Sequence, residues 1–405
     1  MHNCGVIRAT AHDANFQPEK GNSVHRPSRL NIFAATSRAP SRTAVGRAVL
    51  GVLLAATAAS AAAAPAYDHY VRLTPENSVI GNYPTQKAPI LTVRSGDTVK
   101  IDTGGGAGWR NPEMDPAEWL KKNNVPTSID NPALKETLAV LEKTTRYADI
   151  KSGHLLVGPI AVEGAMPGDS LEVRILSVVP RIPYGTTGAG PGRGLKQLDG
   201  PKPPAHVTIL DLKRNVGIFE NGVEVPLAPF MGVMATQPPP EDGPNPSSTP
   251  PGHSGGNLDC RCLVAGTTLY LPVFAPGARF YTGDAHAVQG DGEITGTAIE
   301  TANTVTVRFI LHKGKSLKMP RAETPTHYIA FGLDPNLDNA MQQAVDETVD
   351  YINELEGWDQ FHSLPLASIG VDFHVTQIVD QTKGIHSMIP KNLFKTLKNT
   401  YWYKP

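Results

Sequence analysis

The chain has 405 residues, and its 37 Lys and Arg nearly balance its 38 Asp and Glu. This balance argues against nucleic acid or an anionic membrane surface as a partner, and it favours a small molecule. The 38 Gly and 36 Pro are spread along the chain, which favours many short strands and ordered loops over long helices. We therefore expect a mainly β (α+β) fold.

The N-terminal residues 1–66 have the segment order of an exported protein. Arg42 and Arg47 precede the apolar run AVLGVLLAATAASAAAA, which ends in small residues suited to cleavage. An internal Ala-rich helix is the alternative. The run is too short and too poor in Leu for a membrane span. We predict a disordered extension, then a cleaved signal peptide, a periplasmic or secreted protein, and no membrane association after cleavage.

Residues 67–313 are expected to form a β-rich catalytic core. Two strands around a Ser-Gly-Asp turn are predicted within residues 88–102, and strand patterns return over 154–180. Between them, residues 115–145 carry Leu at helical spacing after the start signal Asn131-Pro132, which predicts a helical insertion. Two long Gly/Pro-rich loops follow this part, and loops of that length in a compact chain are usually functional or disordered.

Residues 314–405 are expected to form an α/β segment that completes the core. A helix is predicted over 334–356, with Asp334-Pro335 at its start, and a strand over 371–379 on which the helix packs. The core as a whole is predicted to be a β-sandwich or barrel. The expected buried face of the helix consists of Leu337, Met341, Val345, Thr348, Ile352 and Leu355.

The three cysteines do not form a disulfide framework. Cys4 lies in the N-terminal extension, and Cys260 and Cys262 are two positions apart. On a strand such residues stand about 6.5 Å apart with parallel side chains, so a disulfide would be strained. We expect two partly buried thiols. Neither has a base beside it in the sequence, which disfavours a nucleophilic cysteine.

The most unusual stretch is GDAHAVQGDGE, residues 283–293. Asp284 and His286 share one face of a strand, and Asp291 and Glu293 repeat this spacing after a turn. His nitrogen and carboxylate oxygen are the ligands that hold divalent metals in hydrolases. A calcium loop is disfavoured because the EF-hand spacing is absent, and a solvated turn remains the simple alternative.

A hydrolytic metal site also needs a proton carrier. Glu163 stands between Val162 and Gly164 in a strand-like segment, a setting that favours a general base, although an outward-facing Glu on an edge strand is equally compatible. His154 and His253 lie at strand–loop junctions and are candidate nitrogen ligands, against the alternative of structural histidines.

Several motifs together resemble one known family. GPIAVEGAMPGDSLEV, APFMGVM, HSGGNLD, LYLPVFAPGARFYTGDAHAVQGDGEITGTAIE and VTQIVDQTKGIHSMIP follow one another between Asp68 and Phe394. Their sequence and order are similar to those of the acetamidase/formamidase family. The resemblance implies a mainly β fold, hydrolysis of a small amide to carboxylate and ammonia, and a divalent metal, zinc.

Matching positions carry the implied site. Through the resemblance, Asp259 also becomes a candidate site residue. The segment after Asp102 and the two cysteine positions differ from the family pattern. These differences leave a larger or a cyclic amide possible as the substrate. We assign Glu163, Glu293 and Asn257 to catalysis, Gln289, Gly255 and Gly256 to substrate binding, and Asp102, His253, Asp284, His286 and Asp291 to the metal.

The first hypothesis is a metal-dependent amidohydrolase that acts on linear, non-peptide amides through metal-activated water. A serine mechanism is disfavoured because no G-x-S-x-G motif is present. The alternatives are a non-catalytic periplasmic ligand-binding β-domain with a structural metal, and a cupin-like metal enzyme. We also expect a homo-oligomer.

Overall fold

The computed structural model describes residues 64–105, 118, 121–122, 131–147, 153–190, 194–196, 198–201 and 203–396. These residues belong to one compact unit. Residues 1–63, which contain nearly all of the predicted extension and signal peptide, lie outside the described residues. Most of residues 115–130 of the predicted helical insertion lie outside them as well. Among the described residues, no helix has both the length and the apolar character needed to cross a membrane.

A nine-stranded sheet forms one layer, and its order shows how the C-terminal part joins the core. Strands from residues 314–405 extend the sheet beyond β13, so the end of the chain continues the layer begun near residue 69. In sheet order the strands are β1 (His69–Val71), β4 (Thr98–Asp102), β16 (Asn303–His312), β6 (Ser170–Pro180), β13 (Thr268–Pro272), β17 (Arg321–Glu323), β18 (His327–Asp334), β20 (Lys383–Pro390) and β19 (Asp372–Gln377).

The second layer is an eleven-stranded sheet, and β14 lies near its middle. Its main path is β10 (Glu224–Pro226), β9 (Val216–Ile218), β8 (His206–Asp211), β7 (Tyr184–Thr187), β15 (Glu300–Thr301), β14 (Phe280–His286), β11 (Phe230–Ala235) and β12 (Gly255–Asn257). Off this path, β5 (Leu155–Val162) pairs with β14 and with β2 (Ser78–Ile80) and β3 (Leu91–Val93).

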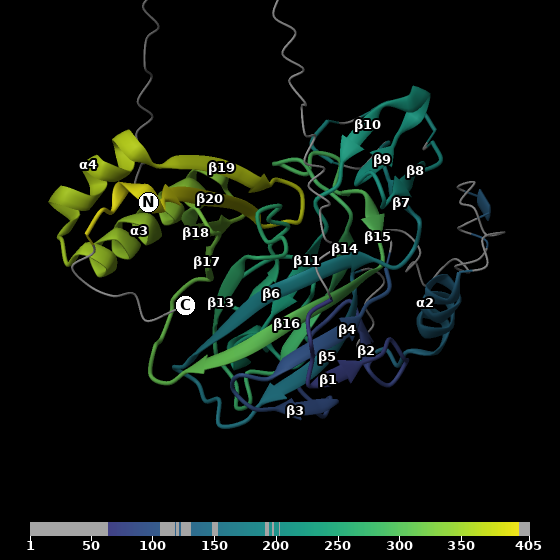
Figure 1. The fold of residues 1–405 in the computed structure, drawn as a ribbon, viewed down its shortest axis with the longest axis horizontal. Coiled ribbons are helices and arrows are strands. Elements are labelled where there is room, and N and C mark those ends of the chain that lie inside the picture. The colour runs from purple at the N-terminus through teal and green to yellow at the C-terminus, as the bar shows by residue number, and fades with distance from the viewer. Residues whose placement is uncertain are drawn as a thin grey trace, which may run out of the picture. The chain divides into compact units, whose positions relative to one another are not determined.

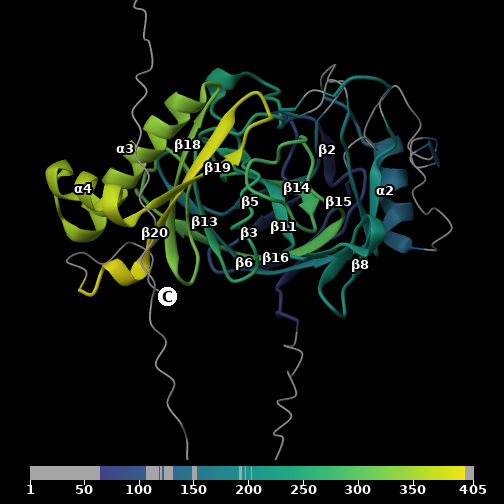
Figure 2. The same cartoon turned by 90° about the horizontal axis from the view of Figure 1, so that it is seen from above.

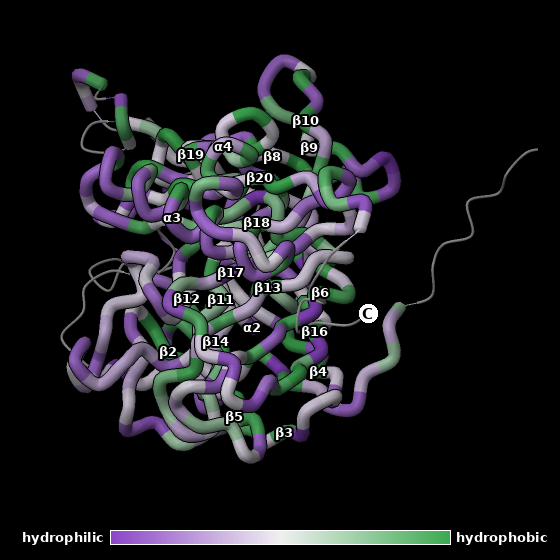
Figure 3. Tube along the Cα trace, turned by 90° about the vertical axis from the view of Figure 1, so that its left-hand side faces the viewer, coloured by the Kyte–Doolittle hydropathy of each residue, from purple (hydrophilic) through white to green (hydrophobic). Residues whose placement is uncertain are grey.

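The two sheets share one hydrophobic core, as the predicted sandwich requires. Val99, Val173 and Val307 of the first sheet belong to the same buried cluster as Val157 and Phe280 of the second. The rings of Phe280 on β14 and Phe309 on β16 meet edge to face, with centroids 5.0 Å apart. Figure 3 shows hydrophobic and hydrophilic stretches alternating along the trace. The mainly β prediction is confirmed.

The helices lie at two separate places on the sheets. Figures 1 and 2 show α2 (Pro132–Lys143) on the opposite side of the strands from α3 (Leu337–Glu356) and α4 (Gln360–Gly370). Asn131 caps α2 by accepting a hydrogen bond from Leu134 N, and Pro132 occupies the first turn, as predicted. Helix α4 was not predicted from the sequence, and its interior includes Pro365. Short 3₁₀ turns occur at Glu220–Gly222, Pro240–Asp242 and Lys391–Leu393.

Helix α3 differs from its prediction at its start and on its buried face. Its N-cap is Asn336, whose side chain accepts hydrogen bonds from the next backbone amides, so Pro335 precedes the helix. Met341 is exposed, whereas Ala340 and Ala344 are buried. The reason is the close approach of β18, since a Cβ on Gly332 would lie 1.9 Å from Ala340 O. Small residues must therefore face the sheet there.

Candidate active site

Six ionisable side chains of the described residues converge at the end of β14. They form three overlapping groups, in each of which the possible ligand atoms lie within 4.8 Å of one another. We call them the carboxylate–histidine cluster. Its members are Asp284 and His286 of β14, Glu300 of β15, Asp259 after β12, Glu293 in the loop after β14, and Asp380 after β19.

Sheet pairing explains why these segments meet. His286 is directly opposite Glu300 in the β14–β15 ladder, and opposite Phe230 in the β14–β11 ladder. The loop after β14 is tied to the end of β19, because Gly292 N donates to Thr376 O and Ile378 N donates to Gly292 O. This bridge carries Glu293 and Asp380 to the same place.

His286 lies at the centre of the cluster. Its Nε2 is 3.1 Å from Asp284 Oδ2 and 3.4 Å from Glu300 Oε1, and its Nδ1 is 3.9 Å from Asp259 Oδ1. The edge of the imidazole meets the ring of Phe230 at a centroid distance of 4.9 Å. One imidazole is therefore fixed by packing while carboxylates approach both of its nitrogens.

A second histidine stands at the edge of the cluster. His154 Nε2 lies 3.9 Å from Asp284 Oδ2, and its Nδ1 is 3.0 Å from the carbonyl oxygen of Ser248. The backbone contact fixes the ring, which leaves Nε2 turned toward Asp284. His154 was one of the two nitrogen-ligand candidates from the sequence, and it is the one that the structure brings to the cluster.

Gly232 of β11 gives the cluster its space. A Cβ at this position would lie 2.5 Å from Asp259 Oδ1, 2.5 Å from Asp284 Oδ2 and 2.9 Å from His286 Cε1. Real Cβ atoms do not approach other atoms this closely, so the three side chains close over a backbone position that only glycine leaves open.

The backbone is strained at three of the cluster's carboxylates. Asp259, Asp284 and Glu293 have φ values of 47°, 55° and 41°, in the left-handed region that non-glycine residues rarely adopt. Such conformations persist only where the surrounding structure imposes them, and they gather at functional sites. The same three residues are buried, which adds a desolvation cost.

Burial and crowding of charges shift the pKa values of the cluster's groups. Burial raises the pKa of Asp259 well above its ordinary value, and the nearby carboxylates Glu293 and Asp284 add to the effect. Burial likewise raises the pKa of Glu293 well above its usual range. Burial raises the pKa of Asp380 to about 6. For His286, burial opposes protonation, but the charges of Glu300 and Asp284 prevail and raise its pKa well above 6.5.

Several buried polar atoms of the cluster have no hydrogen-bond partner among the described residues. They include both ring nitrogens of His286, Asp259 Oδ1 and Glu300 Oε2. Leaving buried polar atoms unpaired is costly, so each such atom calls for an explanation. An imidazole and carboxylates gathered around one point are a suitable donor set for a divalent cation, and the unpaired atoms fit that occupant.

A pocket of ≈ 620 Å³ adjoins the cluster. Glu293 is 7% exposed and belongs both to the cluster and to the pocket wall. The wall is mostly apolar with a few polar groups, as in small-molecule sites. Its polar side chains include Arg261, Gln289 and Asp291, and its apolar ones include Phe219, Val225, Val288 and Ile294.

Two residues predicted for the site lie elsewhere, and we correct their placement. Glu163 is in an exposed turn after β5, with 67% of its side chain accessible and an ion pair to Arg94 at 3.6 Å. The Asp284 end of β14 pairs with the opposite end of β5, near Leu156. His253 is also exposed, and its Nδ1 is 3.1 Å from Lys318 O. Neither faces the cluster.

Asp102 and Asp291 also stand outside the three ligand groups. Asp102 is buried, but Thr304 Oγ1 donates to its Oδ1 at 2.6 Å and Arg181 lies 3.3 Å from its Oδ2. Asp291 is exposed, and its Oδ2 lies 3.5 Å from His374 Nδ1. Asp102 thus has its own polar partners, and Asp291 belongs to the pocket wall.

Gln289, Gly255 and Gly256 were predicted to bind substrate, and Asn257 was predicted for catalysis. Gln289 Nε2 donates to Asp259 O at 2.8 Å, so its amide holds the backbone of a cluster residue. Asn257 is buried on β12. Gly255 and Gly256 have φ values of 86° and 91°, and a Cβ on Gly255 would lie 2.5 Å from Met234 O. Packing requires glycine at 255.

Glu300 and Asp380 were not predicted as site residues, and Asp259 was predicted only through the family resemblance. No local spacing links these residues to the acidic stretch, because strand pairing brings them together. Glu300 did carry one signal, as the last residue of the family motif that begins at Leu269.

A statistical model of the acetamidase/formamidase family matches residues 141–241 and 245–396. The chain therefore belongs to this family of amidohydrolases, which confirms the resemblance found in the sequence. The match includes all six residues of the carboxylate–histidine cluster.

Individual proteins of the family support the assignment. A formamidase of Methylophilus methylotrophus is 27% identical over 325 residues, which cover 62% of this chain and 79% of the relative. The crystal structure of an acetamidase from Bacillus halodurans aligns with a TM-score of 0.66 and 29% identity, covering 81% of this chain and all of that one. An acetamidase structure from Yersinia enterocolitica aligns with a TM-score of 0.65 and 27% identity, over 81% and 93% of the chains.

Proposed function

We propose that the carboxylate–histidine cluster binds a divalent metal ion, zinc, and that the site hydrolyses a small, non-peptide, linear amide to carboxylate and ammonia. The observation that carries the proposal is His286, a fully buried imidazole with buried carboxylates on both sides and no hydrogen bond at either nitrogen within the described residues. The names of the relatives, formamidase and acetamidase, support a substrate of that size.

Asp259, Asp284 and His286 are the residues that would hold the metal. They form the group closed around Gly232, and they supply the oxygen and nitrogen donors that zinc accepts. When bound, such an ion lowers the pKa of water and polarises a carbonyl oxygen. Gln289 keeps Asp259 in place through its hydrogen bond to the Asp259 carbonyl.

Glu293 is the proton carrier in this proposal. Its carboxylate lies beside His286 and Glu300 and also lines the pocket, so it can reach both the cluster and a bound substrate. A carboxylate oxygen of Glu293 accepts a proton from the attacking water and returns it to the departing nitrogen. Burial raises the pKa of Glu293, which makes its carboxylate a stronger proton acceptor toward the attacking water.

The pocket orients the substrate. Its apolar residues Val288 and Ile294 would face the carbon side of an amide, while Arg261 and Gln289 offer polar groups. A volume of ≈ 620 Å³ exceeds what formamide fills, so amides larger than acetamide also fit. The water that attacks gives one carboxylate oxygen, and the C–N bond breaks to release ammonia.

The test combines metal analysis with ammonia release from formamide, acetamide, a larger linear amide and a lactam. We expect stoichiometric divalent metal in the purified protein, turnover of at least one linear amide, and loss of turnover after chelation that added zinc restores. Turnover that survives complete metal removal would overturn the metal role. Metal binding with no ammonia release from any of the amides would instead favour a ligand-binding protein.

A further inference from the structure

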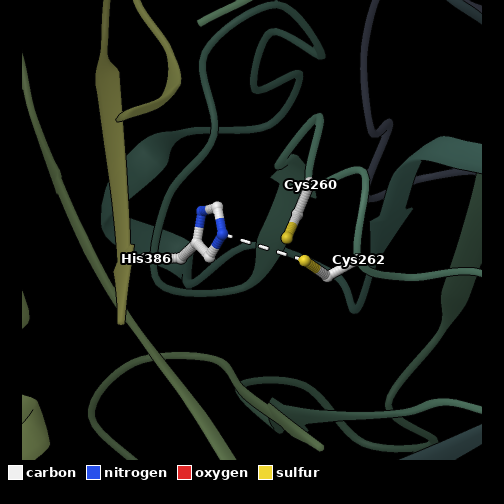
Figure 4. A group of neighbouring side chains, drawn as sticks. All are labelled: Cys260, Cys262 and His386. Carbon is white, nitrogen blue, oxygen red and sulfur yellow. Dashed lines mark hydrogen bonds between the residues drawn. The ribbon is translucent and has the colours of Figure 1, made fainter. Parts of the chain in front are cut away.

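Two thiols and an imidazole meet outside the carboxylate–histidine cluster. Cys260 and Cys262 lie in the turn after β12, and His386 lies on β20. Figure 4 shows both sulfur atoms turned toward the imidazole. Their three ligand atoms are within 4.8 Å of one another, and Cys262 Sγ is 3.8 Å from His386 Nε2. The sequence shows no base beside either cysteine because His386 is 124 positions from Cys262.

These separations suit a metal ion. With Zn–S near 2.3 Å and Zn–N near 2.0 Å, a tetrahedral site places its ligand atoms roughly 3.5–3.8 Å apart. The Cys262–His386 distance is already of that size, and small side-chain rotations would close the others. Both cysteines are free thiols in the structure, so no disulfide competes for the sulfur atoms.

The surroundings of His386 resemble the support that metal-binding histidines receive. The ring is buried, and its Nδ1 is 2.8 Å from Thr376 Oγ1. With a proton on Nδ1 donated to this hydroxyl, the lone pair of Nε2 points to the thiols. The ring of His374 stacks on the ring of His386, with centroids 5.2 Å apart and an interplanar angle of 15°. The imidazole is therefore held in one orientation.

The donors are soft. Besides the two thiols, the thioether of Met388 lies 3.9 Å from Cys262 Sγ. Sulfur donors with one imidazole select Zn²⁺ or Cu⁺, whereas the carboxylate–histidine cluster contains no sulfur. Cys260 follows Asp259 directly in the chain. The chain bends at Asp259, whose φ is positive, and the two side chains therefore belong to different groups of possible ligands.

We propose that Cys260, Cys262 and His386 form a second metal site, which binds a thiophilic d¹⁰ cation, Zn²⁺ or Cu⁺. Binding forms two metal–sulfur bonds and one metal–nitrogen bond and releases the thiol protons to solvent, with no change in the oxidation state of sulfur. The site is independent of the amide-hydrolysing cluster because it uses none of the same side chains.

The test uses the full chain with Cys4→Ser, so that Cys260 and Cys262 are the remaining thiols. Metal-free protein is titrated with Co²⁺ as a spectroscopic substitute for Zn²⁺. We expect thiolate-to-cobalt charge-transfer absorption, which the sulfur-free cluster cannot produce. It should persist in His286→Ala and disappear in Cys262→Ser. Absorption that persists in His286→Ala shows that the thiol site binds metal without the hydrolytic site. The result therefore does not depend on whether the proposed hydrolytic metal is present.

Matched variants test the other ligands. His386→Gln should abolish the absorption, whereas His253→Gln, at an exposed histidine, should leave it unchanged. Thr376→Val, which keeps the volume and removes the hydroxyl, should weaken binding by about 10–100-fold. Circular dichroism confirms that each variant is folded. Should Cys262→Ser fail to fold, protection of both thiols from alkylation by added Zn²⁺ in the Cys4→Ser protein provides the second measurement.

A competition with a Cu⁺ chelator under anaerobic conditions distinguishes copper from zinc as the preferred ion. The proposal is overturned if Co²⁺ gives no charge-transfer band and neither Zn²⁺ nor Cu⁺ protects the thiols. It is also overturned if the intact mass shows a Cys260–Cys262 disulfide in protein purified without oxidant, because a redox pair would then explain the geometry.

Discussion

Asp284 Oδ2 lies 3.1 Å from His286 Nε2, and Asp284 reaches this position with a φ of 55° inside strand β14. A regular strand would also place both side chains on one face, but it would not bend the chain at the carboxylate. The pair is buried and close to Glu300 as well. A left-handed aspartate beside a buried imidazole is costly in free energy, which indicates that function maintains it.

Removing His286 should remove the proposed hydrolytic metal, whereas removing His253 should not. His286→Ala takes the only nitrogen donor from the group with Asp259 and Asp284, so we expect metal content at this site to fall to background. His253→Ala is the matched control, because its exposed ring contacts Lys318 O instead. Elemental analysis of both proteins, in the Cys262→Ser background so that thiol-bound metal is not counted, checks the prediction. Equal loss in both variants would contradict the site.

Gly232→Ala should disable the site without unfolding the protein. The added Cβ would lie 2.5 Å from Asp259 Oδ1 and Asp284 Oδ2, so these ligands must move apart. A displacement of about 1 Å at a catalytic group lowers turnover on the order of 100-fold. Gly252→Ala is the control, because a Cβ there meets nothing within 4 Å. Ammonia release and thermal midpoints are measured together, and normal turnover in Gly232→Ala would show that the cluster is not the reaction centre.

Glu293→Gln should lose most of its turnover, whereas Glu163→Gln should keep it. Glu293 lines the pocket and belongs to the cluster, so its amide variant should lose about 10²–10⁴-fold in turnover while it remains folded. Glu163 is exposed in a turn, so Glu163→Gln should keep near-normal turnover and shift the free energy of unfolding by less than about 0.5 kcal/mol. Steady-state ammonia release decides, and a large loss in Glu163→Gln alone would restore the role that the sequence suggested for it.

Metal-free protein should become less stable as the pH rises. The pKa values of Asp259 and Glu293 are raised in the folded protein, so these groups lose their protons at a lower pH in the unfolded chain. A rising pH therefore stabilises the unfolded state relative to the folded state. His286 also has a raised pKa, and the stability it contributes is present below its unfolded pKa and is lost as the pH rises through the folded value. All three shifts have the same sign.

Thermal midpoints of the chelated protein at about pH 6 and about pH 9 test this dependence, since the unfolded groups titrate near or below the lower value. Added zinc should raise the midpoint more at the higher pH, where the ligands are deprotonated. Glu293→Gln should show a smaller decrease than the unaltered protein. A midpoint that stays level or rises in the chelated protein would contradict the raised pKa values.

The sequence by itself determined the local structure and the family. Strand alternation and turn residues located β3 and β4 around Gly96, and β5 and β6 around Gly168, because these signals depend on neighbours in the chain. Asp284, His286 and Glu293 were predicted as site residues because they lie close together in the stretch 283–293. The ordered motifs identified the acetamidase/formamidase family before any contact was known.

Only the tertiary structure decided which polar residues meet. Asp380 is 94 positions from His286, and strand pairing through Gly292 and β19 brings the two segments together. Glu163 has apolar neighbours in the chain, yet β5 ends at Val162 and leaves it in solvent. The contact between Cys262 and His386 could not be predicted from the sequence either. Side-chain environment depends on sheet register and on the partners that cover each strand, and these are set by contacts between distant segments.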